Sequence, residues 1–578
     1  MLGALRIRCP RRDLAVDHDG DRRYGGVTTT GEAVPAEILF TGGWVYDGST
    51  APARRTQLAV ADGRVLAVGD DLDGLRTPAT RVVDLAGAMV GPGFVDAHVH
   101  PVEGGLEMTR CDLSAAATSQ EYLALIAAYA HQHPDEPWIL GGGWQVAAFP
   151  GGTPLASELD AVVGDRPAVL SNRDHHGVWV SSAALRLAGI DASTPDPHDG
   201  RIERDVHGVP TGTLHEGARD LVARLVPPDS AATERAGLLR GQQHLLSYGI
   251  TGWQDAIVGA HANHTDTGPV YLAAAQSGDL LARVVAALWW DHDRGLEQVP
   301  ELIERRAALA HPRFRASSVK IMQDGIPENL SAGMLTPYLL PDGTPSDRTG
   351  LSLVPPELFG PVATVLDREG FCVHVHTIGD RAVREGLDAI AAARAANGPG
   401  GPRHTFAHVQ VVHPDDVSRF APLGVVVNMQ ALWASNEPQN LDVNLPLLGA
   451  ERYDWQYPFG ALWSAGASFA AGSDWPVTTP DPWAAIHVAV NRTLPRESPE
   501  FHPEPLVPAQ ALTLGQALHA YTAGSAALHG FEATGLLSPG AVADLAVVDR
   551  NPFEADVQEI HAVRTLSTWI DGGEVFTA

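Results

Sequence analysis

Lysine is almost absent from this sequence: Lys320 is the only lysine in 578 residues, and the other 39 basic residues are arginines. Acidic residues outnumber basic ones by 69 to 40, which gives a formal net charge of −29. This balance repels phosphate backbones and anionic lipid surfaces, so it argues against nucleic acid and membranes as partners. The scarcity of lysine also makes Lys320 a candidate for a role that arginine cannot fill.

Cysteine and long apolar runs are scarce too. Cys9, Cys111 and Cys372 are odd in number and far apart, so neither a disulfide framework nor a cysteine-based zinc site is supported. No apolar run approaches the ~20 residues that span a bilayer. The arginines near the N-terminus are followed by aspartates, where an export signal would place an apolar segment. These absences predict a cytoplasmic protein of a reducing compartment.

The two ends of the chain differ from its middle. Residues 1–36 are polar, charged and punctuated by glycine, and we expect them to form a flexible tail. Short β-rich runs bounded by turn residues follow in 37–90 and return in 536–578. Because unpaired strand edges need partners, these runs predict one small β-sandwich domain built from both chain ends.

Between them, in residues 91–535, apolar strand-like runs alternate with helical segments, which is typical of an α/β fold. With eight such runs, the pattern predicts a (β/α)8 barrel of the TIM type. The helix after the fifth run should begin at the N-cap Asp380 and stop at Asn397. About 148 residues, 101–248, separate the first two runs and predict an inserted subdomain over the barrel mouth. The strand candidates are 93–100, 249–256, 282–290, 317–325, 371–380, 403–410, 424–432 and 468–477.

Six polar residues fall near the carboxyl ends of these strands, the face on which such barrels assemble their active sites. The two histidines of the first strand are two residues apart, so both side chains point to the same side. Histidine and aspartate together suit Zn²⁺, with Mn²⁺, Fe²⁺ and Co²⁺ as alternatives. The predicted metal site comprises His98, His100, Lys320, His376, His408 and Asp474.

Each of these residues also has a structural interpretation. A single histidine is more often a surface or core residue than a ligand, and Asp474 alone could be a turn residue. His374 competes with His376, which we favour because it lies nearer the end of its strand. We assign Asp324 and Asp380 to turns and caps. The prediction therefore depends on the whole set.

Lysine can do something that arginine cannot. A catalytic pair of cations about 3.5–4 Å apart needs a bridging anion. A neutral lysine amine can combine with CO₂ to give such an anion, a carbamate, and burial lowers the pKa of lysine towards the neutral form. Arginine stays protonated in proteins. Lys320 is therefore the candidate bridge.

Several motifs resemble one known family: PGFVDAHVHP, VKIMQDG, HTIGDRAV, AGSDWPV and the closing LLSPGAVADLAVVDRNPF. From about residue 37 to 578 the chain resembles the amidohydrolase superfamily, specifically its YtcJ-like amidohydrolase-3 branch, which includes N-substituted formamide deformylase. The resemblance implies that His98 and His100 bind the more buried metal and that His376 and His408 bind the second. It implies that Lys320 is the carboxylated bridge and that Asp474 is a ligand and proton carrier. Ser181 and Gln323 depart from the family pattern near the expected pocket.

The resemblance also implies a function: hydrolysis of a C–N bond in a small amide or N-formyl substrate by metal-activated hydroxide, with two Zn²⁺ per chain. One alternative is a deaminase or cyclic-amide hydrolase with a single metal, and another is a noncatalytic metal-binding relative. Substrate contacts are expected from Trp144, Gln145, Trp433 and Trp475, although each tryptophan could equally be a packing residue. The oligomeric state is open, with a homodimer as one alternative.

Overall fold

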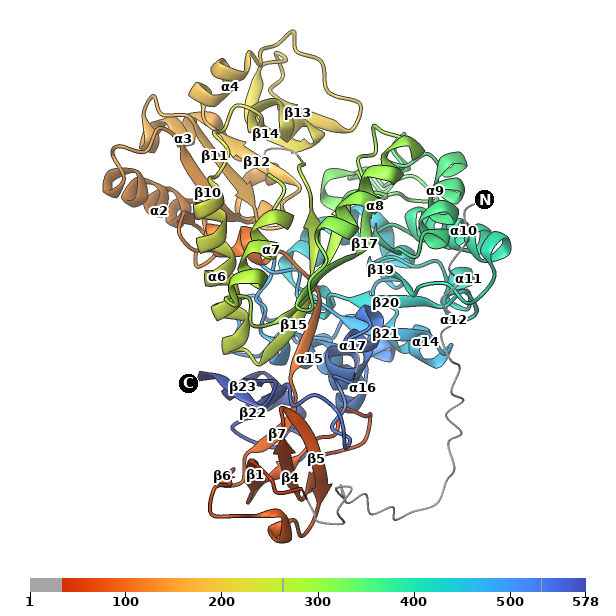
Figure 1. Ribbon diagram of the computed structural model, residues 1–578. Helices are drawn as coiled ribbons and strands as arrows, with labels where there is room; N and C mark the ends of the chain where they lie inside the picture. The colour runs from red at the N-terminus through yellow and green to blue at the C-terminus, as the bar shows by residue number, and fades with distance from the viewer. Residues whose placement is uncertain (1–33, 262–264, 532) are drawn as a thin grey trace, which may run out of the picture.

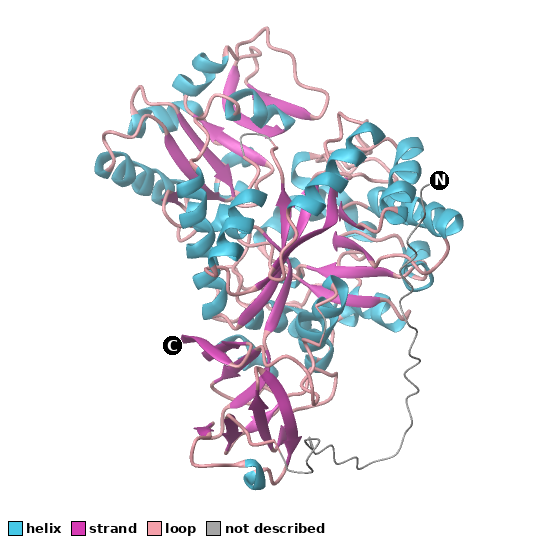
Figure 2. Cartoon of the chain, in the orientation of Figure 1, coloured by secondary structure: helices cyan, strands magenta, loops and turns pink. Residues whose placement is uncertain are grey.

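A parallel β-barrel forms the centre of the molecule (Figures 1 and 2). The computed structural model describes residues 34–261, 265–531 and 533–578, so nearly all of the predicted tail 1–36 lies outside the described residues. Within them, eight parallel strands overlap the eight predicted ranges and confirm the predicted barrel. They are β8 (Phe94–Val99), β15 (Ile250–Val258), β16 (Arg283–Trp289), β17 (Phe314–Met322), β18 (Cys372–Thr377), β19 (His404–His408), β20 (Val425–Met429) and β21 (Ser468–Ala471).

The two edge strands of this sheet meet just beyond their ends. The backbone N–H of Asp474 donates to the carbonyl of His98 at 2.7 Å, and that of His100 donates to the carbonyl of Trp475 at 2.9 Å. These bonds bring the segment after β21 against β8, which nearly closes the barrel. Asp474 is thereby placed beside the two histidines of the first strand.

Helices cover the outside of the barrel, as parallel strands require crossover connections. α10 begins at Asp380 itself, with Gly379 as its N-cap, so the predicted cap residue is the first helical residue. No described helix has the length and apolarity of a membrane span. The helices are α6 (Ala231–Ser247), α7 (Gly268–Ser277), α8 (Val299–Ala308), α9 (Pro356–Arg368), α10 (Asp380–Asn397), α11 (Pro414–Val417), α12 (Phe420–Leu423), α13 (Leu445–Tyr453), α14 (Phe459–Ser464), α15 (Pro482–Asn491), α16 (Leu514–His519) and α17 (Ser525–His529).

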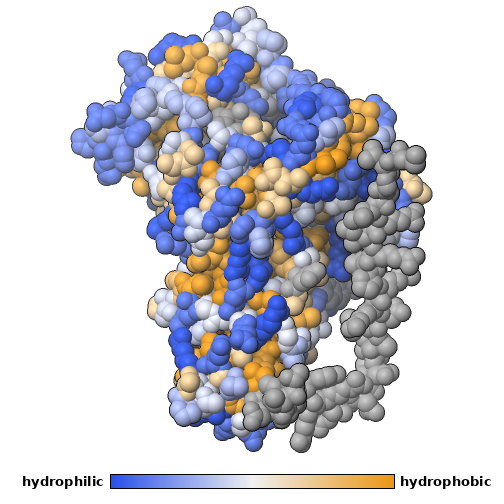
Figure 3. Space-filling view, in the orientation of Figure 1, coloured by the Kyte–Doolittle hydropathy of each residue, from blue (hydrophilic) through white to orange (hydrophobic). Residues whose placement is uncertain are grey.

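The long segment between β8 and β15 carries a sheet of its own (Figure 1). Its described strands run in the order β13-β14-β12-β11-β10-β9 and pack on helices through two apolar clusters. Around α2 its surface is mostly hydrophilic on the face seen in Figure 3. The elements are α1 (Pro101–Glu107), β9 (Cys111–Asp112), α2 (Ser119–Gln132), β10 (Ile139–Trp144), α3 (Ala156–Val163), β11 (Ala168–Asn172), β12 (Gly177–Val180), α4 (Ser182–Ala188), β13 (Gly200–Arg204), β14 (Pro210–Glu216) and α5 (Asp220–Ala223).

Strands from both chain ends lie together below the barrel in Figure 1. The described strands form two sheets, ordered β5-β4-β1-β6 and β24-β23-β22-β7-β2-β3. Phe40 and Trp569 pack edge to face between the ends, with ring centroids 5.3 Å apart. The domain boundaries inferred from the sequence stay predictions. The strands are β1 (Ile38–Thr41), β2 (Trp44–Val45), β3 (Arg54–Arg55), β4 (Gln57–Ala61), β5 (Arg64–Gly69), β6 (Arg81–Asp84), β7 (Met89–Pro92), β22 (Leu545–Val548), β23 (Thr565–Ile570) and β24 (Gly573–Thr577).

Candidate metal centre at the barrel mouth

The two histidines of β8 converge on one carboxylate. Oδ1 of Asp474 lies 3.3 Å from Nε2 of His98 and 3.1 Å from Nε2 of His100. Alternation along a strand places both rings on the same side. Asp474 reaches them from the segment after β21, where its backbone is left-handed with φ 57°. The contact between β8 and the segment after β21 therefore forms one side of the site.

His98 is held from behind by a second histidine. Nε2 of His374 lies 2.9 Å from Nδ1 of His98, and Nδ1 of His374 lies 2.5 Å from Nε2 of Gln254. These contacts fix the ring of His98 and leave its Nε2 facing Asp474. His374 thus lies one layer deeper than the cavity, in the place expected for the competitor of His376.

His376 and His408 form the other side of the site, with ring centroids 4.6 Å apart. Nδ1 of His376 hydrogen-bonds Oδ1 of Asp324 at 3.1 Å, so its Nε2 is left for the cavity. Asp324 also accepts the backbone N–H groups of Ile378 and Gly379. Asp324 therefore lies in the loop after β17 and orients a candidate ligand, a role that the sequence analysis missed.

His408 ends β19 with a left-handed backbone, φ 72°. Its backbone N–H donates to Oε1 of Gln430 at 2.7 Å. Its Nδ1 is buried and makes no hydrogen bond with any described residue. An unpaired buried nitrogen is costly unless something binds it, and a neutral imidazole nitrogen can donate its lone pair to a metal ion.

Lys320 lies on β17, in register with His374 of the neighbouring strand. The residue is only 2% exposed. Burial lowers the pKa of its amine to about 8, although the charge of Asp474 opposes this shift. A substantial fraction of the amine is therefore neutral near physiological pH, which is the form that reacts with CO₂.

The charge states of most of the cluster suit metal binding. His100 is the exception, because burial opposes its protonation but the hydrogen bond and the charge of Asp474 outweigh burial and raise its pKa. Burial, helped by the charges of Lys320 and neighbouring histidines, holds the pKa values of His98, His376 and His408 well below the ordinary range. Burial would raise the pKa of Asp474, but the hydrogen bond from His100 and nearby cations lower it. Neutral imidazoles and an ionised carboxylate are the forms that bind metals.

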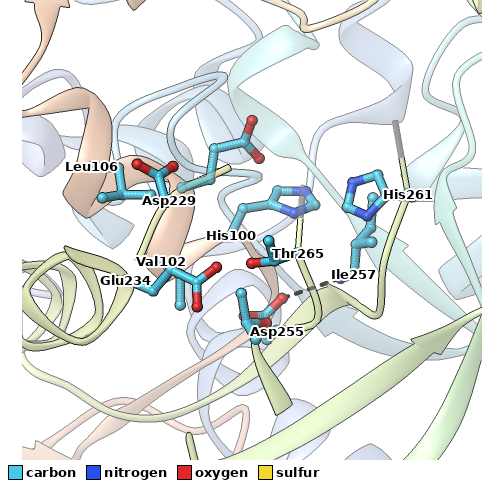
Figure 4. Close-up of a pocket in the computed structure, with 11 residues that line it drawn as sticks. His100, Val102, Leu106, Asp229, Glu234, Asp255, Ile257, His261 and Thr265 are labelled. Atoms are coloured by element: carbon cyan, nitrogen blue, oxygen red, sulfur yellow. Dashed lines mark hydrogen bonds between the residues drawn. The ribbon is translucent and has the colours of Figure 1, made fainter. Parts of the chain in front are cut away.

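All six predicted residues line one cavity of about 270 Å³. The opposite wall comes from the insert and the barrel loops, and it includes His175, His176, Glu216 and Trp433. Figure 4 shows a smaller adjoining pocket, in which His100, Asp255 and His261 come together. The site therefore lies between the barrel and the inserted segment.

His175, on the part of the wall formed by the insert, is protonated, unlike His98, His376 and His408. Nδ1 of His175 lies 3.1 Å from Oε1 of Glu103, and its Nε2 lies 3.3 Å from Oε1 of Glu107. Burial opposes protonation, but the two carboxylates outweigh it and raise the pKa of His175 to about 10. This triad, Glu103–His175–Glu107, joins the loop between β11 and β12 to α1 directly beside the cavity.

Of the four predicted substrate contacts, one lies in the core of the insert and three line a pocket. Contrary to the prediction, Trp144 is fully buried in the core of the insert, where Nε1 donates to the carbonyl of Leu170 at 2.8 Å. Trp433 lines the cavity and stacks on His408, with ring centroids 5.1 Å apart. Gln145 and Trp475 line a neighbouring pocket, which Trp433 also reaches.

The two departures from the family pattern lie away from the cavity, contrary to expectation. Ser181 is buried in the insert, where it caps α4 and binds the backbone of Ala168. Gln323 is also buried and donates to Glu385 at 2.7 Å. Both are packing residues, so neither separates the substrate range of this chain from that of its relatives through direct contact.

The residues at the barrel mouth fit a divalent metal. One ligand atom from each of His98, His408 and Asp474 lies within 4.8 Å of the others. The unpaired nitrogen of His408 and the orienting contacts of His98 and His376 are those expected around metal-binding histidines. Fold and site together are those of a (β/α)8 barrel with a candidate metal centre at its mouth.

Comparisons with known proteins identify the family. The model of the amidohydrolase family "Amidohydro_3" matches residues 81–576. YtcJ of Bacillus subtilis (strain 168) is 29% identical over 93% of this chain and 99% of its own. N-substituted formamide deformylase of Arthrobacter pascens is 26% identical over 89% and 93%. An uncharacterized metal-dependent hydrolase from Pyrococcus horikoshii OT3 shares the fold, with a TM-score of 0.68 at 24% identity over 90% and 99% of the two chains. The chain belongs to the amidohydrolase family and is a hydrolase.

Proposed function

We propose that this enzyme hydrolyses the C–N bond of an amide or N-formyl group in a small molecule. The observation that carries the proposal is Lys320, a buried amine with its pKa lowered to about 8 in a cavity that it shares with the four candidate histidine ligands and Asp474. The similarity to N-substituted formamide deformylase supports an amide-type substrate.

His98 and His100 would hold one divalent cation, and His376 and His408 a second, with Zn²⁺ favoured by imidazole and carboxylate donors. Lys320 would bridge them as a carbamate. In that step the lone pair of neutral Nζ forms a bond to the carbon of CO₂, one C=O electron pair moves to oxygen, and Nζ releases a proton to solvent. The product carries the negative charge that the bridge requires.

Bound cations would supply a hydroxide nucleophile near neutral pH and polarise the carbonyl oxygen of the substrate. Asp474 takes the proton of the attacking water and returns it to the leaving nitrogen, first as a base and then as an acid. A C–O bond forms and the C–N bond breaks, which gives a carboxylic acid and an amine. The lowered pKa of Asp474 keeps the carboxylate ionised for the first transfer.

Substitution of Lys320 tests the proposal. Lys320→Arg should retain the fold and the positive charge yet lose the second metal ion and most activity on a panel of N-formyl and simple amides. Lys320→Ala with a short carboxylic acid should recover part of the activity, because the acid can replace the bridge. Two metal ions per chain in the arginine variant would contradict the carbamate.

A single-metal reaction, such as deamination or hydrolysis of a cyclic amide, is the second candidate. It is favoured by the compact trio His98, His408 and Asp474, whose ligand atoms alone can surround one ion. Metal analysis of the wild-type enzyme separates the two: about two ions per chain supports the bridged site, and about one supports the alternative.

A further inference from the structure

A second histidine–aspartate cluster lies where the insert meets the barrel. His198 and Asp199 immediately precede β13 of the insert, and His292 and Asp293 follow β16 of the barrel. One ligand atom from each of His198, His292 and Asp293 lies within 4.8 Å of the others. Asp199 and His292 also line the cavity at the barrel mouth, so the cluster belongs to its rim.

The nitrogen–oxygen distances within this cluster are longer than direct hydrogen bonds. Nε2 of His292 lies 3.6 Å from Asp199 and 3.8 Å from Asp293, and Nε2 of His198 lies 3.6 Å from Asp293. Other described histidine–carboxylate pairs range from 2.8 Å (His176–Glu216) to 3.6 Å (His413–Asp415), so these gaps lie at the wide end of that range. Zinc bonds to nitrogen and oxygen of about 2.0–2.1 Å place tetrahedral ligands about 3.4 Å apart. The gaps are therefore close to those around a shared cation.

Two further features indicate a cation at this place. Nε2 of His292 is shielded from solvent and makes no hydrogen bond to a described residue, although two carboxylates face it. Gly217 leaves room for the carboxylate of Asp199, since a Cβ there would lie 2.2 Å from its oxygens. His198 and Asp293 are exposed, so an ion can enter from solvent.

We propose that His198, His292 and Asp293, with Asp199 as a fourth ligand, form a second metal site for Zn²⁺ or a similar divalent transition metal. Two imidazoles and two carboxylates are a donor set that such ions accept. The ion ties the insert to the barrel at the rim of the cavity and does not take part in the reaction. The proposal is independent of the substrate and of the number of ions at the barrel mouth.

The test compares zinc content at a fixed, buffered concentration of free Zn²⁺. The double variant H198Q/D293N should contain one zinc fewer per chain than the wild-type holoenzyme. His207→Gln removes another exposed histidine of the insert and should leave the zinc content unchanged. Equal zinc content in all three proteins would overturn the proposal.

Anomalous diffraction at the zinc edge of wild-type crystals provides a measurement that needs no variant. A peak within bonding distance of His292 Nε2, at zinc concentrations that also fill the barrel mouth, is the expected result. No peak there, or a peak that appears only at millimolar zinc, would mean an adventitious ion at most and would overturn the proposal. Neither measurement uses activity, so failure of the proposed reaction would leave both informative.

Discussion

The barrel mouth and the wall of the insert that faces it use the same residue types in opposite charge states. At the mouth, buried histidines crowd around the carboxylate of Asp474 and the amine of Lys320, and burial keeps most of them neutral. On the wall, His175 contacts both Glu103 and Glu107, which hold it protonated. The two carboxylates beside His175 hold it as a cation that joins two segments, whereas burial leaves His98, His376 and His408 neutral.

The largest effect is expected when the carboxylate of Asp474 at the barrel mouth is removed. Asp474→Asn should lower kcat by about 10³-fold, because the amide cannot take a proton from water or return it to the leaving nitrogen. Steady-state kinetics on an amide substrate measure the loss. Glu107→Gln on the opposite wall is the matched control and should lower kcat far less. Equal losses in the two variants would contradict the assignment of proton transfer to Asp474.

A smaller effect is expected for Asp324, which hydrogen-bonds the imidazole of His376. Asp324→Asn should weaken metal binding about 10–100-fold, since the amide orients the imidazole less well than the carboxylate. Competition with a chelator measures the affinity. Asp380→Asn alters another buried carboxylate, which accepts the N–H of Leu335 and contacts no candidate ligand. Its metal affinity should match that of the wild type, and an equal weakening would show that Asp324 acts only through stability.

The protonation of His175 should make the free energy of unfolding depend on pH. The pKa of His175 is raised from 6.5 to about 10 in the folded protein. Its stabilising contribution is therefore complete below pH 6.5 and is lost as the pH rises towards 10. The stability deficit of His175→Gln should shrink over that range, as measured by urea denaturation beside the control His207→Gln. A deficit that does not change with pH would show that His175 is not protonated.

Two tryptophans give the smallest and most selective pair of effects. Trp144→Phe should lower the free energy of unfolding by about 1–3 kcal/mol, because a packed ring and the hydrogen bond to Leu170 are lost. Its kcat/KM should stay near the wild-type value. Trp433→Phe should change kcat/KM with little effect on stability, since this ring lies on the cavity wall. Equal changes of kcat/KM in the two variants would show that Trp144 also contributes to the site.

The barrel mouth was predictable from the sequence because its geometry is local. Alternation along β8 fixes the common side of His98 and His100, and the barrel architecture brings the carboxyl ends of its strands to one face. Asp324 was assigned only to a turn, because its contact with His376 depends on the register between β17 and β18. That register is not apparent from either strand alone.

The insert was less predictable, because its residues are placed by packing between distant segments. Trp144 was predicted as a substrate contact, yet β10 pairs with β9 and β11 and turns its ring into a core with Phe149 and Trp179. His175 meets Glu103 only because the insert folds back on α1. The existence of the insert could be inferred from the length of the gap, but the contacts across it could not.

The most direct test of the bridged site is ¹³C NMR of the holoenzyme equilibrated with ¹³CO₂. Because Lys320 is the only lysine, a carbamate has just one side chain on which to form, and the N-terminal amine is the sole competing amino group. We expect a carbamate resonance in the wild-type enzyme that is absent from Lys320→Arg. A metal-loaded, active wild-type enzyme whose spectrum shows no such resonance would contradict the account.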